Sequence, residues 1–272
     1  MFLPTAGAPL GLKNKMRQIT IIIVIVLYLA VSVHAETEDA VFAILKLSYN
    51  TPGVTPVTGG ICGTAFLIND KTLLTAYHVL NEKTGPNPGF KYAQFWLLKR
   101  GKSKMTVPLE NATFKYFPDI DTTVINLKQP ITDTVKIELQ NSSPAVGDAV
   151  FSIGHAGGGM PATNASWVNA TLILHDYSLQ ESNKSDKTGF IMKIIPATVH
   201  SNDVNITDIV VIKPSFTAVE GMSGGPLLNK KNDKLVGLMS FGLPAEKSFK
   251  DEVFAIDATE IIHKFKSINM EY

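Results

Sequence analysis

Short apolar runs separated by turn-forming residues limit the folds that this chain can adopt. Ten runs of four to seven residues lie between residues 41 and 256, and Gly, Pro, Asn and Asp are common in the spacers. Runs of this length suit β-strands, because a helix needs about 10–12 residues. The runs are Val41–Leu47, Thr64–Ile68, Thr72–Ala76, Tyr92–Leu98, Val124–Leu127, Ala149–Ile153, Ile191–Ile195, Ile209–Ile212, Leu235–Phe241 and Val253–Ile256. They predict an all-β fold, arranged as a sandwich or as barrels.

One helical pattern stands near the C-terminal end of the sequence. Asp257 and Glu260 have the spacing of a capping box at a helix N-terminus. Ile261, Ile262 and Phe265 then recur on one helix face. We expect this helix to pack on the C-terminal domain.

A polar, turn-rich stretch over residues 128–147 divides the strand-forming part of the chain into halves of similar size. Each half holds five or six candidate strands. We therefore predict two β-domains, residues 36–140 and residues 141–272, with the helix in the second.

The first 35 residues have the pattern of an export signal. Lys13, Lys15 and Arg17 precede the uncharged segment Ile19–Val33, whose 15 residues fall short of the roughly 20 that span a bilayer. Small residues at positions 33 and 35 match a signal-peptidase site. We predict cleavage after residue 35 and an exported protein, periplasmic or secreted. The alternative is an uncleaved anchor, which would hold the chain at a membrane.

Charge and composition exclude several functions. Residues 1–35 hold three basic residues and no acidic one, which leaves 22 basic against 24 acidic residues in the remainder. A net charge of −2 there is atypical of nucleic-acid binding, and no nucleic-acid partner is expected. His155, His175 and His200 lack metal-ligand spacing, and Gly157–Gly159 lacks the Lys-Ser/Thr of a phosphate loop, so neither a metal nor another cofactor is expected.

The numbers of cysteines and of asparagine sequons are relevant to the cellular compartment in which the protein folds. Cys62 is the only cysteine, so no intramolecular disulfide can form, and we interpret it as a small buried residue. Six Asn-x-Ser/Thr sequons begin at Asn111, Asn141, Asn164, Asn169, Asn183 and Asn205. They would be glycosylation sites in a eukaryotic secretory pathway and polar loop residues in a bacterium. The sequence leaves both readings open.

The segment from Gly221 to Pro226 (Gly-Met-Ser-Gly-Gly-Pro) carries the strongest chemical signal. Glycines around Ser223 allow a tight turn and a close approach of substrate. A serine nucleophile needs a base within hydrogen-bond reach, and a carboxylate then orients that base. The candidate bases are His78, His155, His175, His200 and His263, and the candidate carboxylates near the first of them are Asp119 and Asp121. His78 ends an apolar strand, a rigid place for a catalytic imidazole.

The same glycines also fit the nucleophile elbow of α/β-hydrolase esterases. Ser223, then Asp251 or Asp257, then His263 would supply the required chain order. An elbow serine is followed by a helix, however, and here a strand pattern follows. The alternating helices of that fold are also missing from the sequence before Ser223.

Several motifs together resemble the chymotrypsin-fold (trypsin-like) serine peptidases, nearest to their disulfide-free bacterial, HtrA-like branch. The motifs are Thr75–Val79, Asp121–Leu127, Gly221–Leu227, Val236–Gly242, Gly60–Ile68 with its Cys-Gly-Thr, and Val146–Gly154. The resemblance covers roughly residues 41–262 in order. Val79 stands where vertebrate members have a cysteine, and no PDZ-like segment follows.

This resemblance implies two perpendicular six-stranded β-barrels with the site between them. It implies that Ser223 attacks a peptide carbonyl, that His78 transfers the proton, and that Asp121 orients His78. The N–H groups of Gly221 and Ser223 would form the oxyanion hole. Ser240, Phe241 and Gly242 would bind the substrate as an added strand, and Thr217 would lie at the base of the primary pocket.

One position departs from the pattern of zymogen-activated members. Met222 stands where they have an aspartate that pairs with a new N-terminus, so activation by that salt bridge is not expected. Residues 217–222 would then need substrate or a partner to become ordered. We predict a serine endopeptidase acting on polypeptides, with a catalytically impaired, peptidase-fold binding protein as the alternative.

Overall fold

The computed structural model describes residues 37–54, 58–81, 89–99, 105–157, 162–168, 171–178, 184–200, 204–243 and 252–270. Thr37–Tyr272 forms one compact unit. The predicted export signal, residues 1–35, lies outside the described residues. Within the ranges above, no helix has the length and apolar character needed to cross a membrane.

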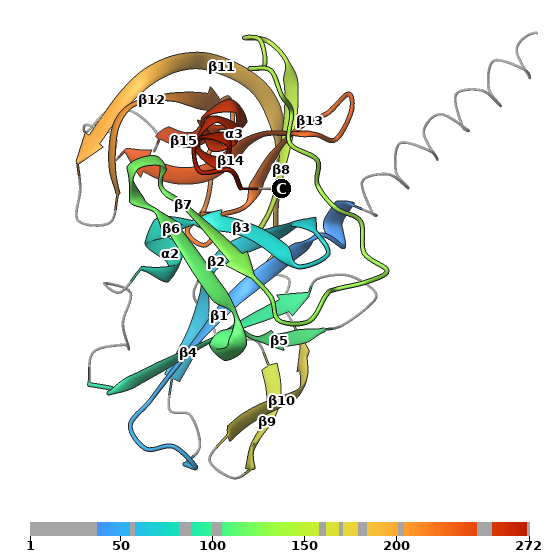
Figure 1. Ribbon diagram of the computed structural model, residues 1–272, viewed down its shortest axis with the longest axis vertical. Helices are drawn as coiled ribbons and strands as arrows, with labels where there is room; N and C mark the ends of the chain where they lie inside the picture. Colours follow the sequence, from blue (N-terminus) through green and yellow to red (C-terminus); the bar gives the residue numbers. More distant parts are fainter. Residues whose placement is uncertain are drawn as a thin grey trace, which may run out of the picture. The chain divides into compact units, whose positions relative to one another are not determined.

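The first half of this unit is an antiparallel sheet of seven strands in the order β5-β4-β1-β2-β3-β7-β6, coloured blue to green in Figure 1. The strands are β1 (Val41–Tyr49), β2 (Thr58–Asn69), β3 (Thr72–Ala76), β4 (Tyr92–Lys99), β5 (Thr106–Pro108), β6 (Thr113–Phe117) and β7 (Thr122–Asn126). Short helices interrupt them: α2 (Tyr77–Leu80), η2 (Leu109–Asn111) and η3 (Pro118–Ile120). Helix α2 directly follows β3 and contains His78, which the sequence placed at the end of the strand, and Asp121 lies between η3 and β7.

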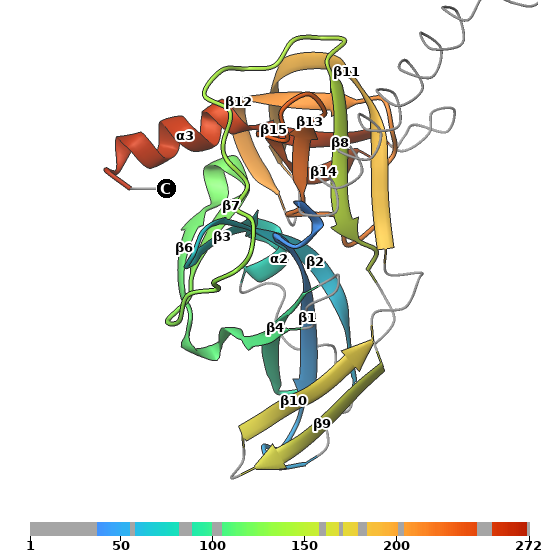
Figure 2. The ribbon, with the colours of Figure 1, turned by 90° about the vertical axis from the view of Figure 1, so that its right-hand side faces the viewer.

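The second half is a closed six-stranded barrel in the order β11-β12-β15-β14-β13-β8 (Figure 2). Its strands are β8 (Ala149–His155), β11 (Lys184–His200), β12 (Asn205–Pro214), β13 (Pro226–Asn229), β14 (Leu235–Leu243) and β15 (Glu252–Asp257). A separate two-stranded sheet consists of β9 (Ala162–Val168) and β10 (Thr171–Ser178). One hydrophobic cluster includes residues from both halves, such as Phe66, Val124 and Leu238.

The all-β prediction is confirmed: nine of the ten predicted runs lie within a strand, and the tenth, Val124–Leu127, extends one residue past the end of β7. The first half differs in detail from a six-stranded barrel. It has seven strands, and no pairing of β5 with β6 is present among the described residues. Pro108 in β5 lacks an N–H for a further partner, which suits an edge strand. The predicted domain boundary at residue 140 stays a prediction.

Helix α3 (Ala258–Ser267) begins as its sequence pattern predicts. The Asp257 side chain caps it by accepting the Thr259 N–H at 2.8 Å, and Ile261, Ile262 and Phe265 are buried. Glu260 accepts a hydrogen bond from the Val210 N–H of β12 at 3.1 Å, and so it ties the helix to the barrel.

The same helix also contacts the first sheet, which the sequence did not indicate. The ring of Phe265 lies 6.0 Å from that of Phe117 at the end of β6. Lys264 forms an ion pair with Asp119 of η3 and lies over the Phe117 ring at 5.9 Å. Helix α3 therefore joins both halves next to the segment that carries Asp121.

Candidate active site

His78 and Asp121 form the best-defined pair of the site. Nδ1 of His78 lies 2.9 Å from Oδ2 and 3.1 Å from Oδ1 of Asp121, whose side chain is fully buried. The backbone N–H of His78 donates to the same carboxylate at 3.0 Å, and the Tyr77 N–H donates to the Asp121 carbonyl oxygen at 3.0 Å. The start of α2 and the end of η3 are thereby fixed against each other.

Local backbone conformation explains why Asp121 reaches this position. It ends η3 in the left-handed region, with φ +42°, and β7 follows directly. Aspartate tolerates this conformation better than most residues. Asp119, two residues earlier, is 57% exposed and pairs with Lys264 instead. Of the two candidate carboxylates, the structure therefore brings Asp121 to His78.

Ser223 lies in a tight turn that only glycines permit. Gly221 has φ +89° and Gly224 has φ +82°, a region that favours glycine. A Cβ atom on Gly224 would lie 2.2 Å from both the Thr64 carbonyl oxygen and the Thr75 hydroxyl, far inside van der Waals contact. The first sheet and the serine loop are thus packed backbone against backbone.

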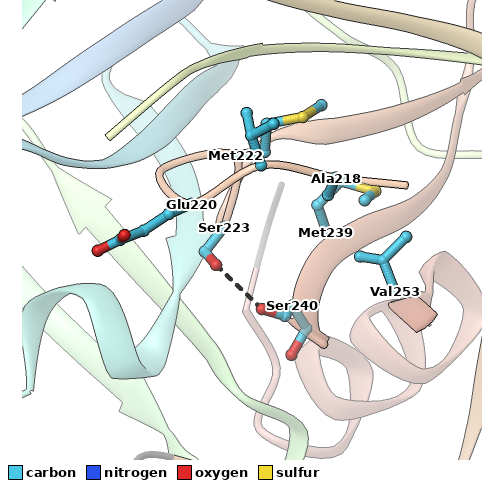
Figure 3. Close-up of a pocket in the computed structure, with 8 residues that line it drawn as sticks. Ala218, Glu220, Met222, Ser223, Met239, Ser240 and Val253 are labelled. Carbon is cyan, nitrogen blue, oxygen red and sulfur yellow. Dashed lines mark hydrogen bonds between the residues drawn. The ribbon is translucent and has the colours of Figure 1, made fainter. Parts of the chain in front are cut away.

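Ser240 of β14 links the serine to the histidine–aspartate pair. The Ser223 hydroxyl donates to the Ser240 carbonyl oxygen at 3.1 Å (Figure 3). The Ser240 hydroxyl donates in turn to Oδ2 of Asp121. His78, Asp121, Ser240 and Ser223 therefore form one chain of contacts that starts in the first sheet and ends in the barrel.

Thr64 of β2 is a structural residue of the site to which the sequence gave no role. Its N–H donates to the Ser223 carbonyl oxygen at 2.9 Å, and its hydroxyl donates to the Gly221 carbonyl oxygen at 2.9 Å. The hydroxyl also accepts the His155 N–H at 3.0 Å. The Cys-Gly-Thr motif was the available signal, but its partners lie 91 and 157 residues away along the chain.

The peptide bond between Glu220 and Gly221 has a defined orientation. The Glu220 carbonyl oxygen accepts the Gly157 N–H at an N–O distance of 2.5 Å. In a trans peptide the C=O and N–H point in opposite directions. The Gly221 N–H is therefore directed away from Gly157.

A pocket of about 150 Å³ adjoins Ser223. Its lining residues are Ala218, Val219, Glu220, Met222, Ser223, Met239, Ser240 and Val253. Figure 3 shows the Glu220 carboxylate directed away from Met239 and Val253. Five of the eight lining residues, Ala218, Val219, Met222, Met239 and Val253, have apolar side chains.

Thr217, which the resemblance places at the base of the primary pocket, does not line this one. Thr217 is exposed and is not among the lining residues, whereas its neighbour Ala218 is. Glu252 forms an ion pair with Lys213 and is likewise not among them.

Ser240, Phe241 and Gly242 lie in β14, as the motif predicted. On one side Phe241 and Gly242 pair with Phe254 and Val253 of β15. Pairing of β14 with β13 on the other side ends at Leu238 among the described strands. The substrate-binding role of these residues stays a prediction.

Within the part of the chain that the structure describes, no three His, Cys, Asp or Glu residues are grouped so as to hold a metal ion. Burial raises the pKa of Cys62 to about 12, and its thiol donates to the Ile44 carbonyl oxygen at 3.4 Å. A thiol with this pKa is protonated at neutral pH and is a poor nucleophile.

The fold and this arrangement of residues define the class of a serine endopeptidase. Residues 63–238 match the family model of the trypsin-like peptidase domain, so the chain belongs to this family. No curated protein sequence matches the chain.

Solved structures with the same fold share little sequence with this chain. The active form of the Rv3671c protease from M. tuberculosis is 15% identical, with a TM-score of 0.54 over 100% of this chain and 96% of that one. The HtrA-type protease AlgW with a tripeptide is 18% identical, with a TM-score of 0.54 over 89% of this chain and 64% of that one. The MamO protease domain from Magnetospirillum magneticum is 15% identical, with a TM-score of 0.51 over 85% of this chain and 98% of that one. At these identities the likeness establishes the fold alone.

Proposed function

We propose that this protein is an exported serine endopeptidase that hydrolyses peptide bonds through Ser223, His78 and Asp121. The observation that carries the proposal is the buried carboxylate of Asp121. The polar groups that meet it are donors: the N–H and Nδ1–H of His78 and the hydroxyl of Ser240. This arrangement fixes the tautomer of His78 with Nε2 unprotonated, ready to accept a proton.

The proposed reaction has two stages. Ser223 Oγ turns from the Ser240 carbonyl oxygen and attacks the peptide carbonyl carbon, while Nε2 of His78 takes the hydroxyl proton. The N–H groups of Gly221 and Ser223 stabilise the tetrahedral oxyanion. His78 then protonates the leaving amine, and an acyl-enzyme on Ser223 remains. A water molecule, deprotonated by His78, hydrolyses the ester and frees Ser223.

Covalent labelling tests the proposal directly. The purified protein is treated with a fluorophosphonate probe, and the labelled residue is located by mass spectrometry. We expect labelling at Ser223 that is lost in Ser223→Ala and lost again after heat denaturation. A folded protein that never reacts would instead support a catalytically impaired binding protein. Labelling at a different serine would refute the assignment.

The apolar pocket supports a preference for substrates with an apolar side chain before the cleaved bond. Ala218, Met239 and Val253 can bury such a side chain, at roughly 25 cal/mol per Å² of apolar surface. A lysine or aspartate there would lose its hydration, and Glu220, the charged residue among the described lining residues, points away from Met239 and Val253. Cleavage of a peptide library should therefore favour apolar over charged residues at this position. Ala218→Lys should reduce that preference.

Export is proposed from residues 1–35 and is tested separately from catalysis. N-terminal sequencing of the protein recovered outside the cytoplasm should begin at Glu36. A protein recovered intact with the membrane fraction would support the uncleaved anchor. A protein recovered only from the cytoplasm would refute export.

A further inference from the structure

Met222, the residue before Ser223, occupies a socket in the wall of the barrel. Its side chain is fully buried. The socket lies over a cross-strand pair, Gly154 of β8 and Ser185 of β11. The Ser185 hydroxyl donates to the sulfur of Met222 at 3.0 Å, and a Cβ atom on Gly154 would lie only 3.2 Å from Met222 Cγ. The lack of a side chain at Gly154 is therefore what makes room for Met222.

The backbone on both sides of Met222 is fixed as well. The Met222 N–H donates to the Val219 carbonyl oxygen at 3.1 Å, and the Met222 carbonyl oxygen accepts the Gly225 N–H at 2.9 Å. A Cβ atom on Gly221 would lie 2.2 Å from the Gly157 nitrogen. The lack of a side chain at Gly221 is what allows the loop to pack this closely on Gly157.

We propose that Met222 is a positioning residue that holds the oxyanion loop in its working conformation. The inference rests on the proposed function. Burial of the thioether replaces the salt bridge that an aspartate makes in zymogen-activated relatives. It keeps the Glu220–Gly221 peptide bonded to Gly157, and so it keeps the Gly221 N–H directed at the substrate oxyanion. The loop is thus assembled in the free protein, without cleavage of the chain and without the bound substrate or partner that the sequence led us to expect.

The test compares two inhibitors, of which only one forms a covalent adduct that places an oxyanion in the hole. A peptide aldehyde forms a tetrahedral adduct with Ser223, whereas the corresponding peptide alcohol occupies only the pocket and the strand. The ratio of their inhibition constants isolates the hole from changes in the pocket, which Met222 also lines. The variants, made in the full chain, are Met222→Leu, Met222→Ala and Gly154→Val. The last fills the socket without altering the loop.

We expect Met222→Leu to keep kcat and the inhibitor ratio within about threefold of wild type, because leucine refills the socket. Met222→Ala and Gly154→Val should each lower kcat and the ratio by about 10²-fold, the effect of losing one oxyanion donor. Leu45→Ala serves as the stability control, since Leu45 is buried in a separate cluster in the first sheet. It should lower the Tm without changing the ratio.

The outcomes are distinguishable. If Met222→Ala and Gly154→Val keep kcat and the ratio within threefold of wild type, the positioning role is wrong. If Met222→Ala does not fold, Gly154→Val decides the question. If wild type is neither labelled by a fluorophosphonate nor inhibited by the aldehyde, the proposed function fails, and the inference fails with it.

Discussion

Replacement of Asp121 by asparagine removes one acceptor from a site in which the described groups that meet the carboxylate, from His78 and Ser240, are donors. An amide offers one oxygen and one NH₂ group, so the NH₂ must face a donor. At the Oδ1 position it would face the backbone N–H of His78, which cannot reverse its polarity. At the Oδ2 position it would face the Ser240 hydroxyl, which can rotate, and Nδ1 of His78. We expect the second arrangement.

This arrangement makes Nδ1 of His78 an acceptor and moves its proton to Nε2. A protonated Nε2 cannot take the proton of Ser223, so the nucleophile is not activated. We expect kcat to fall by about 10⁴-fold, as for the wrong tautomer of a catalytic histidine. That loss corresponds to about 5 kcal/mol of activation free energy.

The assay is kcat and kcat/KM on a peptide substrate, with Tm measured on the same samples. Asp119→Asn is the matched control, because this exposed carboxylate pairs with Lys264 and not with His78. An exposed ion pair contributes at most about 1 kcal/mol, so the control should remain active within about twofold. The reasoning is refuted if Asp121→Asn retains more than a tenth of the activity, or if Asp119→Asn is the inactive variant.

Three further experiments, two with substitutions and one with a thiol reagent, test other parts of the structure. Gly224→Ala forces a Cβ atom against Thr64 at a position with a positive φ. We expect the free energy of unfolding, measured by thermal unfolding, to fall by at least about 1–2 kcal/mol. We also expect fluorophosphonate labelling to be lost. Cys62 has a pKa of about 12, so its thiol stays protonated as the pH rises through 8. Iodoacetamide should therefore modify Cys62 in the denatured protein and leave it unmodified in the folded protein. Measurement of the intact mass by mass spectrometry will show the difference. Phe265→Ala empties a fully buried site where α3 meets the first sheet, and it should cost about 3–5 kcal/mol in the free energy of unfolding from urea titration. An unchanged midpoint would contradict the packing role of α3.

The local sequence pattern was sufficient to predict the strands whose side chains are buried and apolar. β3 was predicted at its observed bounds, Thr72–Ala76, because all five of its side chains are buried. β6 was missed because three of its five side chains are exposed and polar and apolar residues are mixed. β13 was missed because it is four residues long and begins with Pro226. Short or half-exposed strands depend on pairing with distant neighbours, which a local pattern does not contain.

The same distinction applies to the candidate site. The serine, histidine and aspartate motifs are local, and they indicated the residues that the structure connects through Ser240. The environment of Met222 is not local, because Ser185 lies 37 residues before it and Gly154 is further still. In the sequence, Met222 only indicates that the aspartate of zymogen-activated relatives is missing. In the structure, its buried side chain fills the space beside Gly154 and Ser185. The resemblance placed Thr217 at the base of the pocket, whereas in the structure the next residue, Ala218, lines it.

The contacts that assemble the serine loop span long stretches of chain, and this has a consequence for the order of folding. Thr64 and Gly221 are 157 residues apart, and Ser240 and Asp121 are 119 apart. Contacts between such distant residues carry a large loop-closure cost and form slowly. During refolding, hydrolytic activity should therefore return after the circular dichroism signal of the strands. Partly folded copies of the chain expose the segments that are easiest to cleave. Because few active copies would be present at that stage, self-digestion during folding would be limited.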